Sequence, residues 1–400
     1  MADSAVLTDR PILTRQSILR IVLDLLAAEI GTSRARSYLE LSAANWNEAT
    51  RLDAVGLDLD SLERLNASAA LSEFFHLHEY GAEDYLLSLS RIGEWCELVK
   101  QSLAETGTHL TFRTSGSTGV PKRCTHAIAD LMVEVEAWVK LLGPVSRVVS
   151  LVPAHHIYGT IFTALLPDRL EAACISGQPG GASVVARAAP NTVVVGTPTT
   201  WAYLARSLRT FPPGLTGISS TAPLPIQSAH QLGGQGLARL IEIYGSSETG
   251  GIGYRSYPAD SFALLDHWRR DGKGLLSRQT GAGERHAHVM MDAATWIDER
   301  RFTIAHRYDG AVQIGGYNVF PERIRQRLLD HEGVADAVVR LDTSTGRLKA
   351  YVIPAPGVHV TGFADELNAW CADLPSVERP RAITIGGALP RTSMGKLADW

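Results

Sequence analysis

The sequence predicts an α/β protein with a helical N-terminal region, a central α/β core and a small α+β unit at its C-terminal end. Apolar residues have helical spacing up to about residue 100. Short β-branched runs that end in Gly, Ser or Pro follow, and the pattern of apolar and turn residues changes again near residue 309. The 400 residues, of which 45% are hydrophobic, are enough for two or three domains. We therefore expect domains over residues 1–100, 101–308 and 309–400.

The N-terminal region begins with a helix that Thr14 can cap. A second helix is expected to begin near Asp60. The apolar faces of the two helices are expected at i, i+3, i+4 and i+7 spacing, with Ile18, Ile21, Val22 and Leu25 on the first and Leu62, Leu65, Ala69, Leu71, Phe74 and Phe75 on the second.

The central region contains short apolar runs that are typical of buried strands in an α/β sheet. They are VVSLVP (148–153), TVVVGTP (192–198) and RLIEIYG (239–245), and helical segments lie between them.

The C-terminal region begins with a helix over residues 321–331. The runs VADAVVRLD and RLKAYVIP flank a Ser-Thr-Gly turn and predict a hairpin, which a helix around residues 363–371 follows.

Charge and cysteine usage exclude several classes of function. A formal net charge of -4 and a pI of about 6.4 give no general electrostatic case for nucleic acid or an anionic membrane as partner. The four cysteines have no CxxC spacing, so we expect reduced, buried thiols and no zinc site. No run of about 18 or more apolar residues and no signal-like N-terminus is present, so we expect a cytoplasmic protein.

The strongest local signal is a hydroxyl-rich and glycine-rich loop after a strand, over residues 110–122. Its glycines allow a tight turn whose N–H groups face an anion, its hydroxyl groups add donors, and Lys122 adds charge. The alternative is a flexible Ser/Gly surface turn. The P-loop pattern G-x-x-x-x-G-K-S/T is not matched. The loop residues are Thr114, Ser115, Gly116, Ser117, Thr118 and Gly119.

This loop resembles the T-S-G-S-T-G-x-P-K signature of the acyl- and aryl-adenylate-forming superfamily, which includes acyl-CoA and aryl-CoA ligases, peptide-synthetase adenylation domains and firefly luciferase. Further motifs follow in order: VPAHHIY (152–158) resembles P-x-x-H-x-Y, STAPL (220–224) resembles S-G-A-P-L, and YGSSE (244–248) resembles Y-G-x-T-E. The resemblance covers residues 108–400 and implies an adenylate-forming core with a mobile C-terminal lid.

The resemblance also implies roles for individual residues. His156 would lie beside the acyl pocket, Tyr244 would stack on adenine, and Glu248 would hold Mg²⁺. The remaining nucleotide-binding positions would be Thr221, Ala222, Gly245, Ser246 and Ser247.

The C-terminal motifs follow the same order. Asp292 stands 15 residues before Arg307, which is the family's spacing for the pair that holds ribose and phosphate, and Asp309 stands at the hinge position. GGYNVFP (315–321) matches the glycine loop that opens the lid. LPRTSMGK (389–396) places the adenylation lysine at Lys396.

The implied chemistry joins a carboxylate to AMP, which supplies a good leaving group. An anion must approach a polyanionic nucleotide, so positive charge is needed where negative charge gathers in the transition state. Lys396 and a Mg²⁺ ion held by Glu248 would supply it, and Lys122 would hold the departing pyrophosphate. Plainer alternatives exist: Lys396 as a solvated charge, Glu248 as a helix-start carboxylate, Tyr244 as core, His156 as a hydrogen-bonded pocket histidine, and Asp309 as a turn residue.

The sequence departs from the family in length. The phosphate loop begins early, and only 44 residues separate Glu248 from Asp292, about half the interval usual in the family. Much of the small β-barrel subdomain is therefore expected to be missing.

The segment VGLDLDSLERL (55–65) resembles the G-x-D-S-L segment of acyl carrier proteins, in which the serine bears phosphopantetheine. Ser61 would be that serine. Asp60 and Glu63 also form an ordinary helix capping pair, which makes a helical region packed on the core the alternative.

Together these features predict an ATP- and Mg²⁺-dependent ligase that converts a small carboxylic acid to its acyl-AMP and transfers the acyl group to the thiol of CoA or of a carrier protein's phosphopantetheine. The compact plan resembles ligases of aryl polyene and xanthomonadin-type pigment pathways, which favours a hydroxybenzoate-like aryl acid. A fatty acyl ligase and a catalytically silent nucleotide- or acyl-binding module are the alternatives.

Overall fold

The computed structural model describes residues 12–34, 36, 41, 45–105, 108–114, 122–177, 181–272, 275–307, 310–389 and 400. Two compact units divide the chain. The first holds the described residues up to 290 and the segment 296–303, and the second holds 291–295 and the described residues from 304 onward.

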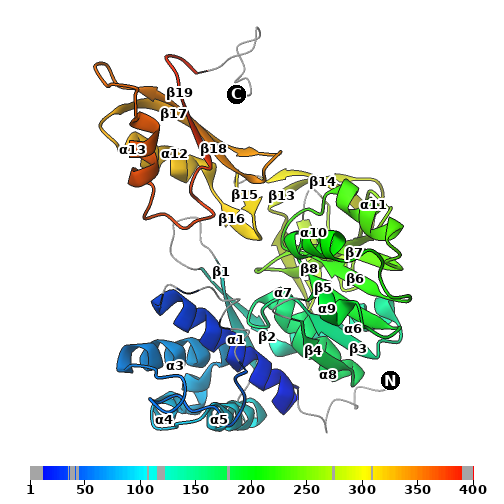
Figure 1. The fold of residues 1–400 in the computed structure, drawn as a ribbon. Coiled ribbons are helices and arrows are strands. Elements are labelled where there is room, and N and C mark those ends of the chain that lie inside the picture. Colours follow the sequence, from blue (N-terminus) through cyan, green and yellow to red (C-terminus); the bar gives the residue numbers. More distant parts are fainter. Residues whose placement is uncertain are drawn as a thin grey trace. The chain divides into compact units, whose positions relative to one another are not determined.

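The N-terminal helices α1 (Arg15–Ser33), α3 (Ser61–Phe75) and α5 (Ile92–Glu105) belong to the first unit, with the short η1 (Leu77–Tyr80) and α4 (Glu83–Leu86) (Figure 1). The predicted caps are confirmed, since Thr14 Oγ1 accepts from Ser17 N and Asp60 forms a capping box with Glu63.

The predicted apolar face of α3 is wrong in its first half. Leu62 and Leu65 are 65% and 51% exposed, and Ala69 is exposed as well. The helix packs on α1 and on β1 (His109–Thr114) through the opposite stripe, where the Phe74 ring lies 5.3 Å from that of Phe112. Helical spacing alone identified the helix and its buried Leu71, Phe74 and Phe75, but it placed Leu62 and Leu65 on the wrong side.

The Glu63 carboxylate ties α3 to α1, because it accepts hydrogen bonds from the Arg34 guanidinium at 2.6 Å and from Ser33 Oγ at 2.8 Å. The Arg34 hydrogen bond is the main cause that lowers the pKa of Glu63 to about 2. A depressed carboxyl pKa stabilises the folded state above the unfolded pKa, and this stability is lost as the pH falls toward the folded pKa.

We therefore expect Glu63→Gln to lower the free energy of unfolding by roughly 1–3 kcal/mol at neutral pH. The difference from wild type should shrink by more than half at about pH 3, because the unfolded wild-type carboxyl is already protonated there. Urea unfolding followed by circular dichroism at both pH values measures the difference. An equal difference at both pH values would contradict this account.

The first unit contains most of a nine-stranded sheet in the order β13-β14-β9-β8-β7-β6-β5-β3-β4. The predicted central strands are confirmed as β3 (Arg147–Ser150), β5 (Thr192–Gly196) and β7 (Arg239–Ser246). The others are β4 (Ala173–Ser176), β6 (Thr216–Ser219), β8 (Gly250–Ser256), β9 (Phe262–Leu264), β13 (Asp292–Trp296) and β14 (Arg301–Arg307). Strands β4, β3, β5, β6 and β7 run parallel, whereas β8 and β9 continue the sheet antiparallel.

Helices cover both faces of the parallel part. Side chains of α9 (Ala182–Val185), α10 (Pro198–Ser207) and α11 (Ile226–Gly234) form one core with β3, β5 and β7, including the fully buried Trp201. The helical segments α6 (Ile128–Leu142), α7 (Ile157–Thr160), η2 (Ile161–Leu165) and α8 (Leu166–Leu170) pack together, and η2 also lies against β3 and α1. Buried, β-branched strands between two helical layers are typical of parallel sheets.

The phosphate-loop segment lies between two strands that form an antiparallel pair, β1 and β2 (Lys122–Ala127). A separate three-stranded sheet of β10 (Trp268–Arg270), β11 (Leu275–Gln279) and β12 (Arg285–Val289) occupies the shortened interval between Glu248 and Asp292.

The second unit has the predicted α+β pattern. It contains the hairpin β15 (Val312–Ile314) and β16 (Tyr317–Val319), then α12 (Pro321–Leu329), β17 (Val334–Asp342), β18 (Arg347–Pro354), α13 (Phe363–Trp370) and β19 (Ala382–Ile385). Gly315 and Gly316 make the tight turn of the first hairpin with φ angles of 59° and 87°, a conformation that glycine adopts without strain.

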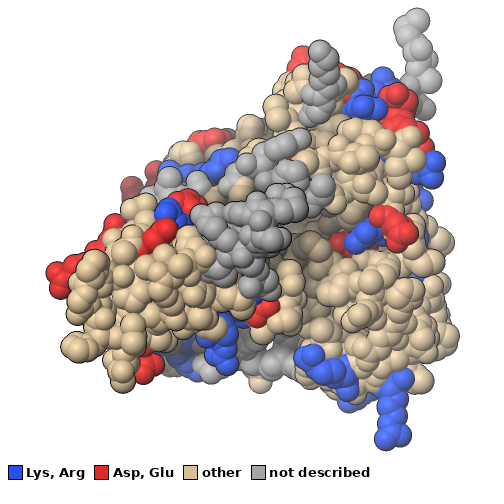
Figure 2. All heavy atoms as spheres, turned by 90° about the horizontal axis from the view of Figure 1, so that it is seen from above, with Lys and Arg blue, Asp and Glu red and all other residues tan. Residues whose placement is uncertain are grey.

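No described helix is long and apolar enough to cross a membrane. The four cysteines are buried and unbridged, as predicted. On the face drawn in Figure 2, blue and red side chains lie in small separate groups among the described residues.

Candidate active site

Several predicted site residues of the first unit follow the carboxyl ends of the parallel strands. The segment with His156 follows β3, Thr221 follows β6, and Tyr244 to Glu248 end β7 and begin the turn into β8. The chain leaves β3 first for β4 on one side and then returns to β5 on the other, so a topological switch point lies between β3 and β5. Ligands of open α/β sheets bind outside such carboxyl ends.

Tyr158 connects the segment after β3 to the ends of two neighbouring strands. Its hydroxyl lies 3.0 Å from the carbonyl oxygen of Gly196 on β5 and 3.1 Å from that of Ile218 on β6. Burial raises the pKa of Tyr158 well above its usual range, so the phenol stays protonated and can donate. The segment carrying His156 is thereby held against the sheet.

The paired imidazoles of His155 and His156 have ring centroids 4.3 Å apart. Desolvation lowers the pKa of His156 to about 4, although the residue is exposed by area. Desolvation, together with the neighbouring His156, lowers the pKa of His155 well below its usual range. Both rings are neutral at physiological pH, so neither brings a fixed positive charge to the site.

Thr221 has an unusual backbone conformation for a β-branched residue, with φ of 79°. Its hydroxyl oxygen is buried and has no hydrogen-bond partner within the described part of the chain. Ser219 and Glu242 are register partners on β6 and β7, so Thr221 and Tyr244 stand at the same level of the sheet edge. Strain and an unsatisfied polar group at one position indicate a functional site.

Tyr244 rests on an aromatic cluster. Its ring centroid lies 5.8 Å from that of Phe262 and 5.7 Å from that of Phe302. A β-bulge interrupts the pairing of β7 and β8 between Tyr244 and Gly245. Bulges re-aim side chains next to active sites, and here the packed ring is half-buried.

Lys122 and Glu248 come from distant parts of the sequence and form an ion pair, with 2.9 Å between Lys122 Nζ and Glu248 Oε1. Both side chains are accessible, at 58% and 44% of their area. Burial alone would raise the pKa of Glu248, but hydrogen bonds that include those from Lys122 and Ser246 lower it. The Glu248 hydrogen bond raises the pKa of Lys122. A cation suited to phosphate and an anion suited to a metal ion therefore stand side by side.

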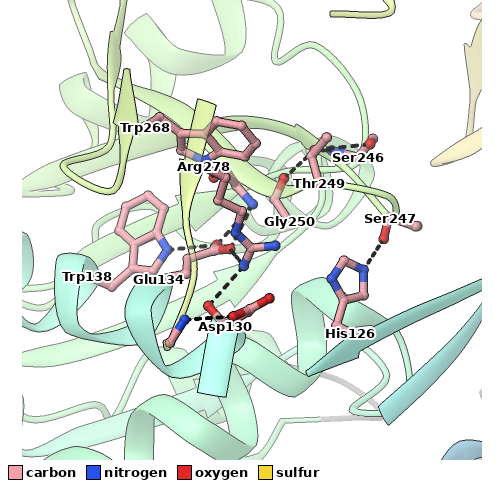
Figure 3. A network of polar contacts seen from close by, with 12 residues as sticks. His126, Asp130, Glu134, Trp138, Ser246, Ser247, Thr249, Gly250, Trp268 and Arg278 are labelled. Carbon is pink, nitrogen blue, oxygen red and sulfur yellow. Dashed lines mark hydrogen bonds and ion pairs between the residues drawn. The ribbon is translucent and has the colours of Figure 1, made fainter. Parts of the chain in front are cut away.

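The turn between β7 and β8 is also held from beneath, as Figure 3 shows. His126 Nε2–H donates to the carbonyl oxygen of Ser247 at 2.7 Å, and burial lowers the pKa of His126, which keeps the ring neutral. Both carboxylate oxygens of Glu134 lie 3.0 Å from the backbone nitrogen of Gly251. Sequence reasoning assigned no role to His126 or Glu134.

Several predicted site residues lie outside the described residues, namely Ser115, Gly116, Ser117, Thr118, Gly119, Asp309 and Lys396. Thr114 is the last residue of β1, Asp292 begins β13, and Arg307 ends β14. Ala222 follows Thr221 in the turn after β6, and Gly245, Ser246 and Ser247 lie between Tyr244 and Glu248. Ser61 is exposed in the first turn of α3.

Comparisons with known proteins identify the family of the chain. The model of the AMP-binding enzyme family matches residues 91–277, and that of the AMP-binding enzyme C-terminal domain matches residues 324–396. The chain is 39% identical to a 4-coumarate–CoA ligase of Halorhodospira halophila, over 96% of this chain and 99% of the relative. It is 37% identical to a 4-coumarate–CoA ligase of Rhodobacter capsulatus, over 95% and 99%.

Among solved structures, o-succinylbenzoate CoA synthetase of Bacillus subtilis superposes with a TM-score of 0.59 at 17% identity, over 95% of this chain and 91% of that one. This likeness concerns the fold. Fold, site and comparisons together define an AMP-forming acid–CoA ligase. The chain belongs to the AMP-binding enzyme family, which uses ATP to form adenylates.

Replacing the strained Thr221 by glycine is expected to stabilise the fold and weaken activity. Relief of the left-handed backbone and of the unpaired buried hydroxyl should raise the free energy of unfolding by about 1–2 kcal/mol. If this hydroxyl hydrogen-bonds a ligand, its loss should lower kcat/KM for the acid by about 3- to 10-fold.

The matched control is Asn191→Gly, which also replaces a residue at positive φ, at 58°. Asn191 lies just before the amino end of β5, whereas Thr221 follows the carboxyl end of β6. The two residues therefore lie at opposite ends of the parallel strands. This control should leave activity unchanged. If the Thr221→Gly variant is less stable than wild type, the claim that the backbone is strained at Thr221 is wrong.

Proposed function

We propose that this protein activates an aryl carboxylic acid, 4-coumarate in the first place, as its acyl-AMP and transfers the acyl group to CoA. The carboxylate oxygen attacks the α-phosphorus of ATP and pyrophosphate leaves. The CoA thiol then attacks the acyl carbon, AMP leaves, and the thiol proton is released. The length match to the 4-coumarate–CoA ligases supports this choice, because nearly the whole of this chain and of both relatives is covered.

The Lys122–Glu248 contact is the observation that carries the proposed chemistry. Adenylation requires positive charge near the polyphosphate. Lys122 offers a point charge, and the lowered pKa of Glu248 keeps its carboxylate ionised and able to bind a hard cation. Mg²⁺ fits this donor and, when bound, would neutralise phosphate charge. Lys122, which stands beside Glu248, would orient the pyrophosphate.

The other described residues position the substrates. The Tyr244 ring, supported by Phe262 and Phe302, provides a flat surface for adenine. The neutral His156 borders the acid pocket without a positive charge that would trap the acid's carboxylate as an ion pair. The Tyr158 hydrogen bonds keep that wall in place.

The C-terminal unit is proposed to act as a mobile lid that pivots at Asp309 and delivers Lys396 for the first half-reaction. Asp292 and Arg307 are proposed to hold the ribose and phosphate. The pigment-pathway resemblance, a hydroxybenzoate substrate, a carrier-protein acceptor and a phosphopantetheine group on Ser61 stay predictions.

Acid-dependent ATP–pyrophosphate exchange tests the proposal, with 4-coumarate, 4-hydroxybenzoate, cinnamate and palmitate as acids. Exchange and CoA thioester formation should be fastest with 4-coumarate. Faster turnover of palmitate would make the protein a fatty acyl ligase, and no exchange with any acid would favour a silent binding module. Intact mass after treatment with a phosphopantetheinyl transferase tests Ser61.

A further inference from the structure

One continuous segment, β2 followed by α6, contacts the turn between β7 and β8 along its length. Lys122 reaches Glu248, His126 reaches the Ser247 carbonyl, and Glu134 receives the Gly251 N–H. The exposed Lys122 lies at one end of this series and Glu134, which is 1% exposed, lies at the other.

The Glu134 carboxylate lies within hydrogen-bond distance of the β7–β8 turn but farther from the nearest positive charge. Besides the Gly251 N–H, its carboxylate accepts from Trp138 Nε1 at 3.1 Å. The buried Arg278 guanidinium is 4.0 Å away and donates instead to the backbone oxygen of Asp130 at 3.0 Å. Figure 3 shows Glu134 between Trp138 and Arg278, facing the start of β8.

Packing alone does not call for a carboxylate at this position. Burial raises the pKa of Glu134, and a buried ion pair adds little stability compared with apolar residues of similar volume. The backbone opposite is shaped to fit the carboxylate. A Cβ atom built on Gly250 or Gly251 would lie 2.3 Å or 2.6 Å from a Glu134 oxygen.

The other side of Gly251 is held as well. Trp268 Nε1 donates to the Gly251 carbonyl oxygen at 2.7 Å, and Thr249 Oγ1 donates to the Gly250 carbonyl oxygen at 2.9 Å. The peptide groups that follow Glu248 therefore have little freedom to shift. The position of the Glu248 carboxylate depends on the position of the backbone from Thr249 to Gly251.

We propose that Glu134 is a positioning residue that fixes the Ser246–Gly251 turn against the segment carrying Lys122. It thereby sets the separation between the cation that meets the polyphosphate and the carboxylate that meets Mg²⁺. This inference rests on the proposed function of Lys122 and Glu248. It assigns the separation of these two side chains to Glu134, a buried residue that would contact neither the polyphosphate nor Mg²⁺.

The test measures ATP binding to the full-length protein by calorimetry, without acid, in the presence and absence of Mg²⁺. The readout is the ratio of the two affinities, because a partly unfolded fraction lowers both affinities alike and leaves the ratio unchanged. Glu134→Gln keeps the size of the side chain and removes its charge. The ratio should fall by about 10-fold, which is typical when a group that orients a metal ligand is changed.

Glu63→Gln is the matched control, since it also removes the charge of a buried carboxylate, which on α3 is paired with Arg34. Its ratio should equal that of wild type although its stability is lowered. Trp138→Phe serves if Glu134→Gln does not fold, because it removes one donor to Glu134, and a fall of about 3-fold is expected.

An unchanged ratio in Glu134→Gln, or in Trp138→Phe where the first variant does not fold, overturns the positioning role. A wild-type protein whose ATP binding does not respond to Mg²⁺ overturns the proposed function itself, and the inference with it.

Discussion

Replacing Lys396 by alanine is expected to slow formation of the acyl-AMP by about 10²–10³-fold. The carboxylate of the acid and the α-phosphate repel each other, and this repulsion grows as the new bond forms. If the C-terminal unit delivers Lys396 only when it closes, as proposed, the lysine charge acts on the transition state more than on bound ATP. KM for ATP should therefore change much less than kcat. ATP–pyrophosphate exchange with 4-coumarate measures the effect.

The second half-reaction provides the control for this variant. When the acyl-AMP is supplied ready-made, Lys396→Ala should form the CoA thioester at close to the wild-type rate, because no anion then has to approach ATP. Equal slowing of both half-reactions would indicate a general defect of the C-terminal unit. Full-speed adenylation by the variant would remove Lys396 from the chemistry.

Sequence patterns identified the elements because strong local signals coincided with tertiary packing. The runs that became β3, β5 and β7 are β-branched, apolar and bounded by turn residues, and a sheet covered on both faces needs such strands. The buried face of α3 could not be predicted from local patterns in the same way. Leu62 and Leu65 have the spacing of a buried stripe, yet α1 and β1 cover the opposite side. Which side is buried depends on partners that are distant in sequence.

In the candidate site, too, local motifs could be read from the sequence, whereas contacts between distant residues could not. Lys122 and Glu248 are 126 residues apart, and each was found from its own local motif, whereas their mutual contact is a property of the fold. Glu134 carries no motif, but one signal was present. It lies on the same helical stripe as the buried Leu131 and Trp138, three residues after the first and four before the second. A charged residue on an apolar stripe is rarely buried without a specific partner.

The β7–β8 turn, which carries Glu248, leads to the last prediction, that Gly250→Ala strongly lowers activity and strongly destabilises the protein. Gly250 has φ of 68°, which disfavours any side chain, and the new methyl group would overlap the Glu134 carboxylate. Backbone strain and overpacking together should lower the free energy of unfolding by about 3 kcal/mol or more. A shift of the turn by about 1 Å would misplace Glu248 and lower kcat/KM by about 10²-fold.

Gly283→Ala separates the two causes. Gly283 has φ of 84°, and its added Cβ would meet no atom within 4 Å. This control should therefore lose only the roughly 1–2 kcal/mol of a left-handed backbone and keep full activity. Urea unfolding and ATP–pyrophosphate exchange on both variants compare them. If Gly250→Ala loses no more stability than Gly283→Ala, the carboxylate of Glu134 does not confine the turn, because the methyl group has found room beside it.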